Sequence, residues 1–130
     1  MIETTVIAAG ALMLGAAVGA AAMAGRGSPS TPKAYIITEV DVTGDAEAFQ
    51  RDYAAHAAAT TVPFGGRYLA RGGRTVTLEG DPPKGRIVIS VFDSVEQAQA
   101  WRNCPEYVNI AAVRLREAKS RQYIVEGLPE

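Results

Sequence analysis

Alternating and β-branched apolar residues predict strands near the start and in the second half of a folded region. Residues 34–42 read AYIITEVDV, and residues 86–92 read RIVISVF. Successive side chains of a strand point to opposite faces, so one face of the first segment is apolar apart from Thr38. Runs of this composition are typical of strands. A last strand is predicted at residues 121–126.

Helical spacing of apolar residues predicts two helical regions. Asp45 is a candidate N-cap, and the residues that follow it at helical spacing are Ala46, Phe49, Tyr53, Ala57 and Thr60. Ser94 and Gln97 fit a capping box for a helix that runs to Trp101. Pro105 suits the first turn of a further helical segment, with Asn103 or Cys104 as its cap.

Glycine and proline mark the connections between these elements. Residues 67–71 and 74–79 flank Gly72-Gly73, which predicts a β-hairpin with a primed two-residue turn. Residues 80–85 are predicted to form a loop. The resulting order, β-α-β-β-α-β, is the ferredoxin-like α+β arrangement, placed at residues 34–130. Its helices cover one face of the sheet, so the other face requires a partner, most simply a second copy of the chain.

An uncharged apolar run precedes the predicted domain. Residues 6–24 read VIAAGALMLGAAVGAAAMA, and residues 26–33 form a Gly/Ser/Pro linker. Residues 1–25 fit a cleaved signal peptide, because Ala22 and Ala24 have the A-x-A spacing. They also fit a membrane anchor with a G-x-x-x-G pair, or a buried helix. We expect an exported or a membrane-anchored domain, with membrane contact only through this segment.

Composition excludes several classes of site. The 130 residues carry a formal net charge of −1, which gives no indication of nucleic-acid binding. One cysteine and one histidine exclude an intrachain disulfide and a multi-histidine metal site. Phosphate-loop, dinucleotide-binding, zincin and haem-attachment motifs are absent. No metal and no cofactor are expected.

Three motifs together resemble a known family. They are the opening strand AYIITEVDVT, the segment GGRYLARGG at residues 65–73, and WRNCPEY at residues 101–107. The chain resembles domain of unknown function family 1330, a branch of the dimeric α+β barrel superfamily, across residues 34–127. The resemblance implies a ferredoxin-like protomer that forms a homodimer through its sheet. The superfamily includes cofactor-independent monooxygenases, haem-degrading enzymes and lactone isomerases.

Charged strand residues are the first candidates for a site. Arg67 and Arg71 are predicted to share a sheet face and to clamp a carboxylate or phosphate in a cleft between sheet and helices. The alternative is a structural ion pair with Glu39 or Glu79. Glu39 and Asp41 share a face of the first strand, where two carboxylates can act as acid and base.

The remaining candidates lie on the predicted helices. His56 is a candidate general base, although an exposed helix histidine is the plainer interpretation. Cys104 at a helix start is a candidate thiolate, or a small packing residue. Trp101 and Tyr107 are candidate ligand contacts, or core aromatics.

Three functions remain open. The first is a small-molecule binder or cofactor-independent enzyme whose cleft takes an anionic or phenolic compound through Arg71, Glu39, Tyr107 and His56. The second is a non-catalytic dimeric module whose polar residues only stabilise the fold. The third is a haem-handling enzyme with His56 as the axial ligand.

Overall fold

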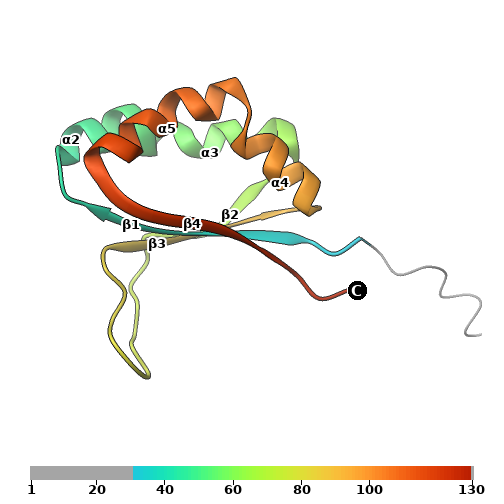
Figure 1. Cartoon of the computed structure of the whole chain (residues 1–130), viewed down its shortest axis with the longest axis horizontal. Coiled ribbons are helices and arrows are strands. Elements are labelled where there is room, and N and C mark those ends of the chain that lie inside the picture. The colour runs from blue at the N-terminus through green and yellow to red at the C-terminus, as the bar shows by residue number, and fades with distance from the viewer. Residues whose placement is uncertain (1–30, 130) are drawn as a thin grey trace, which may run out of the picture. The chain divides into compact units, whose positions relative to one another are not determined.

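A four-stranded antiparallel sheet with helices on one face forms the described part of the chain. The computed structural model describes residues 31–129. The strands are β1 (Ala34–Val42), β2 (Arg67–Arg71), β3 (Arg86–Phe92) and β4 (Ala118–Glu126), in the sheet order β2-β3-β1-β4. Figure 1 shows the helices together on one side of the sheet. The ferredoxin-like α+β order predicted from the sequence is therefore confirmed.

The central strand β1 pairs along its whole length with β4, and from Ala34 to Val40 with β3. Its first residue, Ala34, lies opposite Phe92 of β3 and Glu126 of β4. Every second side chain, from Ala34 to Val40, is buried beneath the helices. The alternation in the sequence predicts this strand with its observed bounds. Strand β4 begins at Ala118, three residues before its predicted start, because the chain enters it directly from the preceding helix.

The first helical region is continuous but changes its winding. It comprises α2 (Ala46–Phe49), a π-helical stretch η1 (Gln50–Ala54), α3 (Ala55–Thr61) and a final 3₁₀ turn η2 (Val62–Phe64). The predicted cap is confirmed, since the Ala48 amide donates to Asp45 Oδ1 at 3.0 Å. The π-helical stretch carries the buried Tyr53. Such stretches frequently lie at functional sites.

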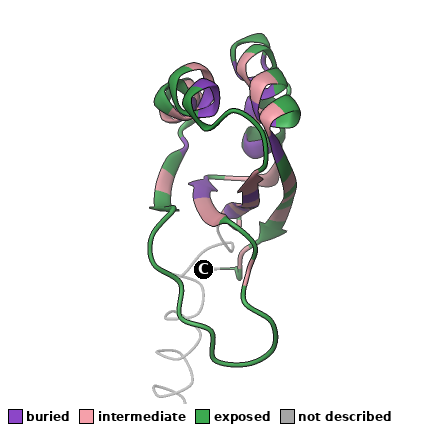
Figure 2. Cartoon of the chain, turned by 90° about the vertical axis from the view of Figure 1, so that its left-hand side faces the viewer, coloured by how far each residue is buried: buried purple, intermediate pink, exposed green. Residues whose placement is uncertain are grey.

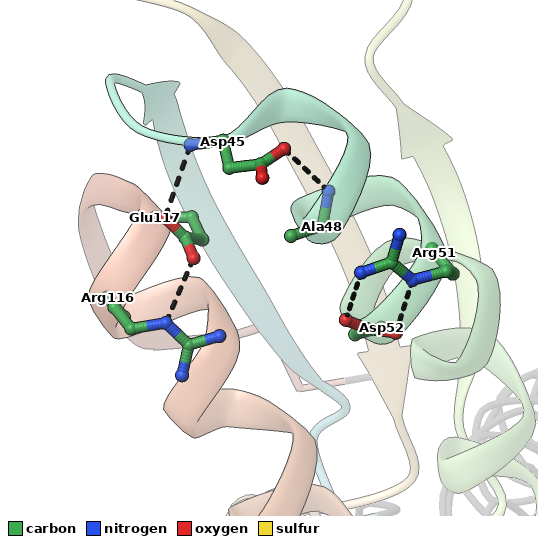
Figure 3. Close-up of polar contacts among 6 residues, drawn as sticks. All are labelled: Asp45, Ala48, Arg51, Asp52, Arg116 and Glu117. Carbon is green, nitrogen blue, oxygen red and sulfur yellow. Dashed lines mark hydrogen bonds and ion pairs between the residues drawn. The ribbon is translucent and has the colours of Figure 1, made fainter.

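The start of α2 is tied to the end of the last helix, as Figure 3 shows. The Asp45 amide donates to Glu117 Oε1 at 3.2 Å, and Arg116 Nε donates to Glu117 Oε2 at 2.9 Å. These donors hold the pKa of Glu117 below its ordinary value, the Arg116 hydrogen bond being the larger cause. A separate pair, Arg51 and Asp52, lies exposed on η1.

The second helical region begins as the sequence predicts. Helix α4 (Val95–Arg102) is capped by Ser94 Oγ, which accepts from the Gln97 amide at 3.1 Å. Helix α5 (Pro105–Glu117) has Pro105 in its first turn and Cys104 as the residue before it. Cys104 is buried and its side chain makes no cap hydrogen bond.

The predicted hairpin around Gly72-Gly73 is wrong. Strand β2 pairs with β3, and residues 72–85 form an exposed loop that extends from the sheet on the side away from the helices. Gly72 has a positive φ of 67° but Gly73 does not, so no primed Gly-Gly turn forms. Residues 86–92 form the partner strand instead because they also pair with β1 and place Phe92 in the core beneath the helices, whereas residues 74–79 would offer only Val76 and Leu78.

A β-bulge in β2 overturns a second expectation. Tyr68 lies opposite Ser90 and Ala70 lies opposite Ile89, so Leu69 is an extra residue without a partner. A bulge shifts the register by one residue and so reverses the face of the side chains that follow. Arg71, opposite Val88, faces the helices, while Arg67, opposite Val91, faces away. The two arginines do not share a sheet face.

The two faces of the sheet are covered very differently (Figure 2). The face under the helices contributes Ala34, Ile36, Val40 and Phe92 to a core that also contains Phe49, Tyr53, Trp101 and Tyr107. No described element covers the other side, which we call the open face. Its apolar residues are Tyr35, Ile37, Ile87, Ile89, Val91, Tyr123 and Val125.

The apolar run at residues 6–24 lies outside the described residues. The expectations of a signal peptide, an anchor or a buried helix therefore keep their status as predictions. Between residues 31 and 129, no helix combines the length and apolar character needed to cross a bilayer.

Candidate functional site

A small cavity, partly open to solvent, lies between the sheet and the first helical region. We call it the central cavity. Its volume is about 30 Å³, which is room for one or two water molecules. The side chains around it are mostly apolar and aromatic, with polar groups from all four strands. They are Thr38, Val40, Phe49, Tyr53, Ala54, Ala57, Tyr68, Arg71, Arg86, Val88, Ser90, Trp101 and Gln122.

Tyr53, a residue of the cavity wall, shares a hydrogen bond between hydroxyls with the buried Tyr107. The Tyr53 and Tyr107 hydroxyl oxygens are 2.8 Å apart, and Gln122 Nε2 lies 3.5 Å from the Tyr107 oxygen. Gln122 Nε2 also donates to Thr38 Oγ1 at 3.1 Å. The pKa of Tyr53 is strongly raised. Burial is the larger cause, and the neighbouring Tyr107 is the second. Tyr53 therefore stays a neutral phenol near neutral pH and offers a hydrogen bond rather than a base.

A third phenol lies nearer the mouth of the cavity. Burial raises the pKa of Tyr68 to about 12, and Arg71 opposes part of that shift. The Arg71 guanidinium carbon lies 5.4 Å from the centre of the Tyr68 ring. A cation at this distance from an aromatic face is attracted to it. Tyr68, like Tyr53, is therefore a hydrogen-bond donor at neutral pH.

Two guanidinium groups line the same cavity without a carboxylate partner. Arg71 ends β2, and Arg86 begins the adjacent β3 with its guanidinium carbon 5.4 Å from the Phe49 ring centre. The ion pairs of the described residues join Lys33–Asp93, Arg51–Asp52, Arg116–Glu117 and Arg121–Glu39. None involves Arg71 or Arg86. The cavity therefore has a positively charged side without a matching anion.

The other candidates on the strands lie away from this cavity. Glu39 is on the open face, where Arg121 binds it across the β1–β4 pair. Asp41 lies opposite Lys119 on the same face. Arg67 also faces that side. The expected ion pairs of Arg67 or Arg71 with Glu39 or Glu79 are not formed, because the bulge and the long loop separate these groups.

The candidates on the helices are divided between cavity and surface. Trp101 lines the cavity and its Nε1 donates to Thr60 Oγ1 at 2.9 Å. Tyr107 is 0 % exposed and reaches the cavity through Tyr53. His56 is exposed on α3 and does not line the cavity, so it cannot ligate a haem iron there in this arrangement. No cluster of metal-ligating side chains occurs between residues 31 and 129.

Sequence reasoning missed Arg86, Tyr68 and Gln122 as cavity residues. The alternation of β3 contained the signal for Arg86, because it places this residue on the face of Val88 and Ser90. Tyr68 follows in the same way once β2 is paired with β3. Gln122 could be found only after the β1–β4 register was known, since it lies opposite Thr38.

Comparison with solved structures shows the same fold in distant proteins. RPA0582 from Rhodopseudomonas palustris, a protein of unknown function, is 19 % identical with a TM-score of 0.61, over 79 % of this chain and 88 % of that one. SnoaB from Streptomyces nogalater, a cofactor-independent oxygenase, is 16 % identical with a TM-score of 0.54, over 73 % of this chain and 92 % of that one. No curated protein matches the sequence.

The family is shown by a match that covers most of the chain. The model of the domain of unknown function DUF1330 matches residues 33–128. This range contains every strand and helix described above. The chain belongs to the DUF1330 family, and its described domain is a ferredoxin-like α+β fold.

Proposed function

We propose that this domain is a homodimer that binds a small anionic or phenolic compound in the central cavity. The observation that carries the proposal is the pair Arg71 and Arg86, two guanidinium groups without ion-pair partners beside an aromatic cavity. Guanidinium groups bind carboxylates and phenolates through charge-assisted hydrogen bonds. Aromatic walls from Phe49, Tyr68 and Trp101 suit a flat apolar body.

Binding requires the mouth of the cavity to open. The present volume holds water but not an aromatic ring. Arg71 is exposed and Arg86 is half-buried, and each rests against an aromatic ring rather than in an ion pair. Such contacts are weak at exposed sites, of order 1 kcal/mol. An incoming carboxylate can therefore draw both side chains outward and enlarge the cavity towards solvent.

The test uses the fluorescence of Trp101, which is the only tryptophan of the chain and lines the cavity. We expect 4-hydroxybenzoate to change this fluorescence saturably in the full chain. Arg71→Ala and Arg86→Ala should each weaken binding about tenfold, which is about 1.4 kcal/mol. Arg67→Ala is the matched control, from the same strand but the opposite face. Equal losses from Arg67→Ala and Arg71→Ala would contradict the proposal.

A cofactor-independent enzyme acting on the same bound compound is the second candidate. The cavity offers neutral phenols as hydrogen-bond donors and two guanidinium cations. A substrate that reacts there would therefore have to bind as an anion, with its own negative charge. SnoaB, whose fold is similar, is a cofactor-independent oxygenase. Oxygen uptake by the complex with 4-hydroxybenzoate, lost in Arg71→Ala, would favour this candidate. Binding without uptake favours the non-enzymatic binder.

The dimer is proposed to form through the open face. Tyr123 and Val125 are 41 % and 47 % exposed there, beside the half-buried Ile37 and Ile89. Exposed apolar patches of this kind mark protein interfaces, and a symmetric pair can bury the same patch on both copies. Native mass spectrometry of the full chain should give a dimer. A stable monomer would reject this part of the proposal.

The proposal for localisation is export or anchoring through residues 6–24, as the apolar run suggests. Cell fractionation tests it. Deleting residues 1–25 should move the domain from the membrane or the exported fraction to the interior of the cell. An unchanged distribution would reject both alternatives.

A further inference from the structure

A buried arginine outside the central cavity has no anionic partner. Arg114 on α5 is 2 % exposed, and no residue between 31 and 129 accepts a hydrogen bond from its Nε. Its Nη1 donates to Ser120 Oγ, and its guanidinium carbon lies 5.7 Å from the Tyr53 ring centre. The neighbouring acid, Glu117, is already held by Arg116 and the Asp45 amide. Burying a cation without a counter-charge is costly.

A second arginine reaches the same place from another helix. Arg102, at the end of α4, donates from Nε to Gln122 Oε1 at 2.7 Å. Its guanidinium carbon lies 5.3 Å from the Tyr107 ring centre. Arg102 takes part in none of the ion pairs of residues 31–129. Two guanidinium groups thus converge beside β4 with neutral partners only.

Both arginines line a hollow that is separate from the central cavity. We call it the edge hollow, because its floor is the edge strand β4. Its volume is about 450 Å³, within the range of small-molecule sites, roughly 300–1,000 Å³. Gln122 is the one residue that lines both spaces. The other lining side chains are Ile36, Leu115, Ser120, Tyr123 and Ile124, so no carboxylate lines the hollow.

We infer that the edge hollow binds a small aliphatic carboxylate. The carboxylate would lie between Arg102 and Arg114, where a planar guanidinium offers paired donors that match its two oxygens. Its chain would lie along Leu115 and Ile124. An apolar chain distinguishes this ligand from inorganic phosphate, which would leave those side chains unused. The bound anion would also supply the counter-charge that Arg114 lacks.

The experiment measures hexanoate binding to the full chain by isothermal titration calorimetry, with 1-hexanol and inorganic phosphate as comparison ligands. We expect hexanoate to bind more tightly than both. Arg102→Gln keeps a side chain that can reach Gln122 but removes the charge, and should weaken hexanoate binding at least about tenfold. This position is half-buried, so the variant avoids the folding risk of replacing the buried Arg114.

A second variant tests the location without touching a charge. Leu115→Trp should block the hollow and abolish hexanoate binding, because Leu115 is 62 % exposed and lines it. Val108→Trp is the matched control, at an exposed position of the same helix outside the hollow. Arg67→Ala, on the open face and outside both spaces, should leave hexanoate binding unchanged. Hexanoate binding that survives both Arg102→Gln and Leu115→Trp, or no hexanoate binding at all, overturns the inference.

The outcome is independent of the proposed function. If hexanoate binding responds to Arg71→Ala and not to Arg102→Gln, the carboxylate occupies the central cavity and the edge hollow is rejected. If 4-hydroxybenzoate fails to bind while hexanoate follows Arg102 and Leu115, the central cavity is rejected and the edge hollow stands.

Discussion

The two faces of the sheet each carry residues that are unusual for their degree of burial. The face beneath the helices is buried, yet it contains Thr38, Ser90 and Gln122 and meets the hydroxyls of two tyrosines. The open face is accessible, yet it presents the aliphatic and aromatic residues of three strands. Burial alone would predict neither the polar groups on the covered face, beside core residues such as Ile36 and Phe92, nor the apolar ones on the open face, beside charged residues such as Glu39 and Arg121.

The difference indicates what each face is for. Buried polar groups cost stability unless they are satisfied, and the hydrogen bonds among Tyr53, Tyr107, Gln122 and Thr38 satisfy most of them. Such a network is retained where a protein needs polar groups inside, as in a ligand site. An accessible apolar face is retained where another protein surface covers it. The helix-covered face therefore suits a small molecule, and the open face suits a second copy.

The largest effect should come from a charge placed on the open face. Ile89→Lys puts a cation in the centre of the proposed interface, where burial without a partner costs several kcal/mol. We expect light scattering to show a monomer. Val76→Lys, in the exposed loop, is the control and should remain a dimer. A dimer in both variants would place the interface elsewhere and break the comparison between the faces.

A smaller effect is expected from the buried hydroxyl network. Tyr107→Phe removes the partner of Tyr53 at 2.8 Å and leaves that hydroxyl buried, which should lower the free energy of unfolding by about 1–3 kcal/mol. Tyr35→Phe, on the open face, loses no comparable contact. It should change the free energy of unfolding by less than about 0.5 kcal/mol. Chemical denaturation measures both. Equal losses would mean that the two faces do not differ in this respect.

Alkaline pH tests the burial of Tyr68. Its pKa rises from 10.0 to about 12 on folding, so the neutral phenol favours the folded state. The stabilisation is complete below pH 10 and is lost as the pH rises through 12. Relative to Tyr68→Phe, the wild type should lose up to about 2 kcal/mol across that interval. Parallel pH profiles of unfolding for the two proteins would show that Tyr68 is not buried in this way.

The smallest effect should come from the rim of the helix layer, where α2 meets α5. The pKa of Glu117 is held below its ordinary 4.5, so its stabilisation is present above that pH and is lost as the pH falls through the lower, folded-state value. Glu117→Gln should unfold at a lower temperature than the wild type at pH 7, and the difference should shrink in acid. A difference that is constant with pH would assign the effect to packing instead.

Elements with a strong local pattern, such as alternating apolar residues or a capping side chain, could be predicted from the sequence. Elements whose position depends on which of two segments pairs with a strand could not. The nine residues of β1 alternate so regularly that their bounds follow from the sequence. The caps at Asp45 and Ser94 also follow, because their side chains act locally. The partner of β2 depends on whether pairing with residues 74–79 or pairing with β3 is the more stable. The local Gly-Gly signal contains no information on that comparison and was misleading. The winding of η1 left no recognisable mark in the apolar spacing.

The candidate site shows the same division. Arg71, Trp101 and Tyr107 were singled out from the sequence and lie in or against the central cavity. Arg67, Glu39 and His56 were singled out with them and lie outside it. Residue type identifies groups capable of the chemistry, but their convergence depends on register and strand order. Arg86 and Gln122 became visible only when those were known.

The extra residue in β2 has a consequence for how this strand tolerates change in length. Leu69 has no partner opposite it, and removing it would straighten the strand with every backbone partner restored. Arg71 would keep Val88 opposite it and would stay beneath the helices, because the partners of Tyr68 and Ala70 are already consecutive residues of β3. Pairing of Leu69 would have the opposite effect: with Leu69 opposite Ile89, Arg71 would lie opposite Ile87 among the aliphatic residues of the open face. In this strand, the register of one residue decides which surface carries the charge.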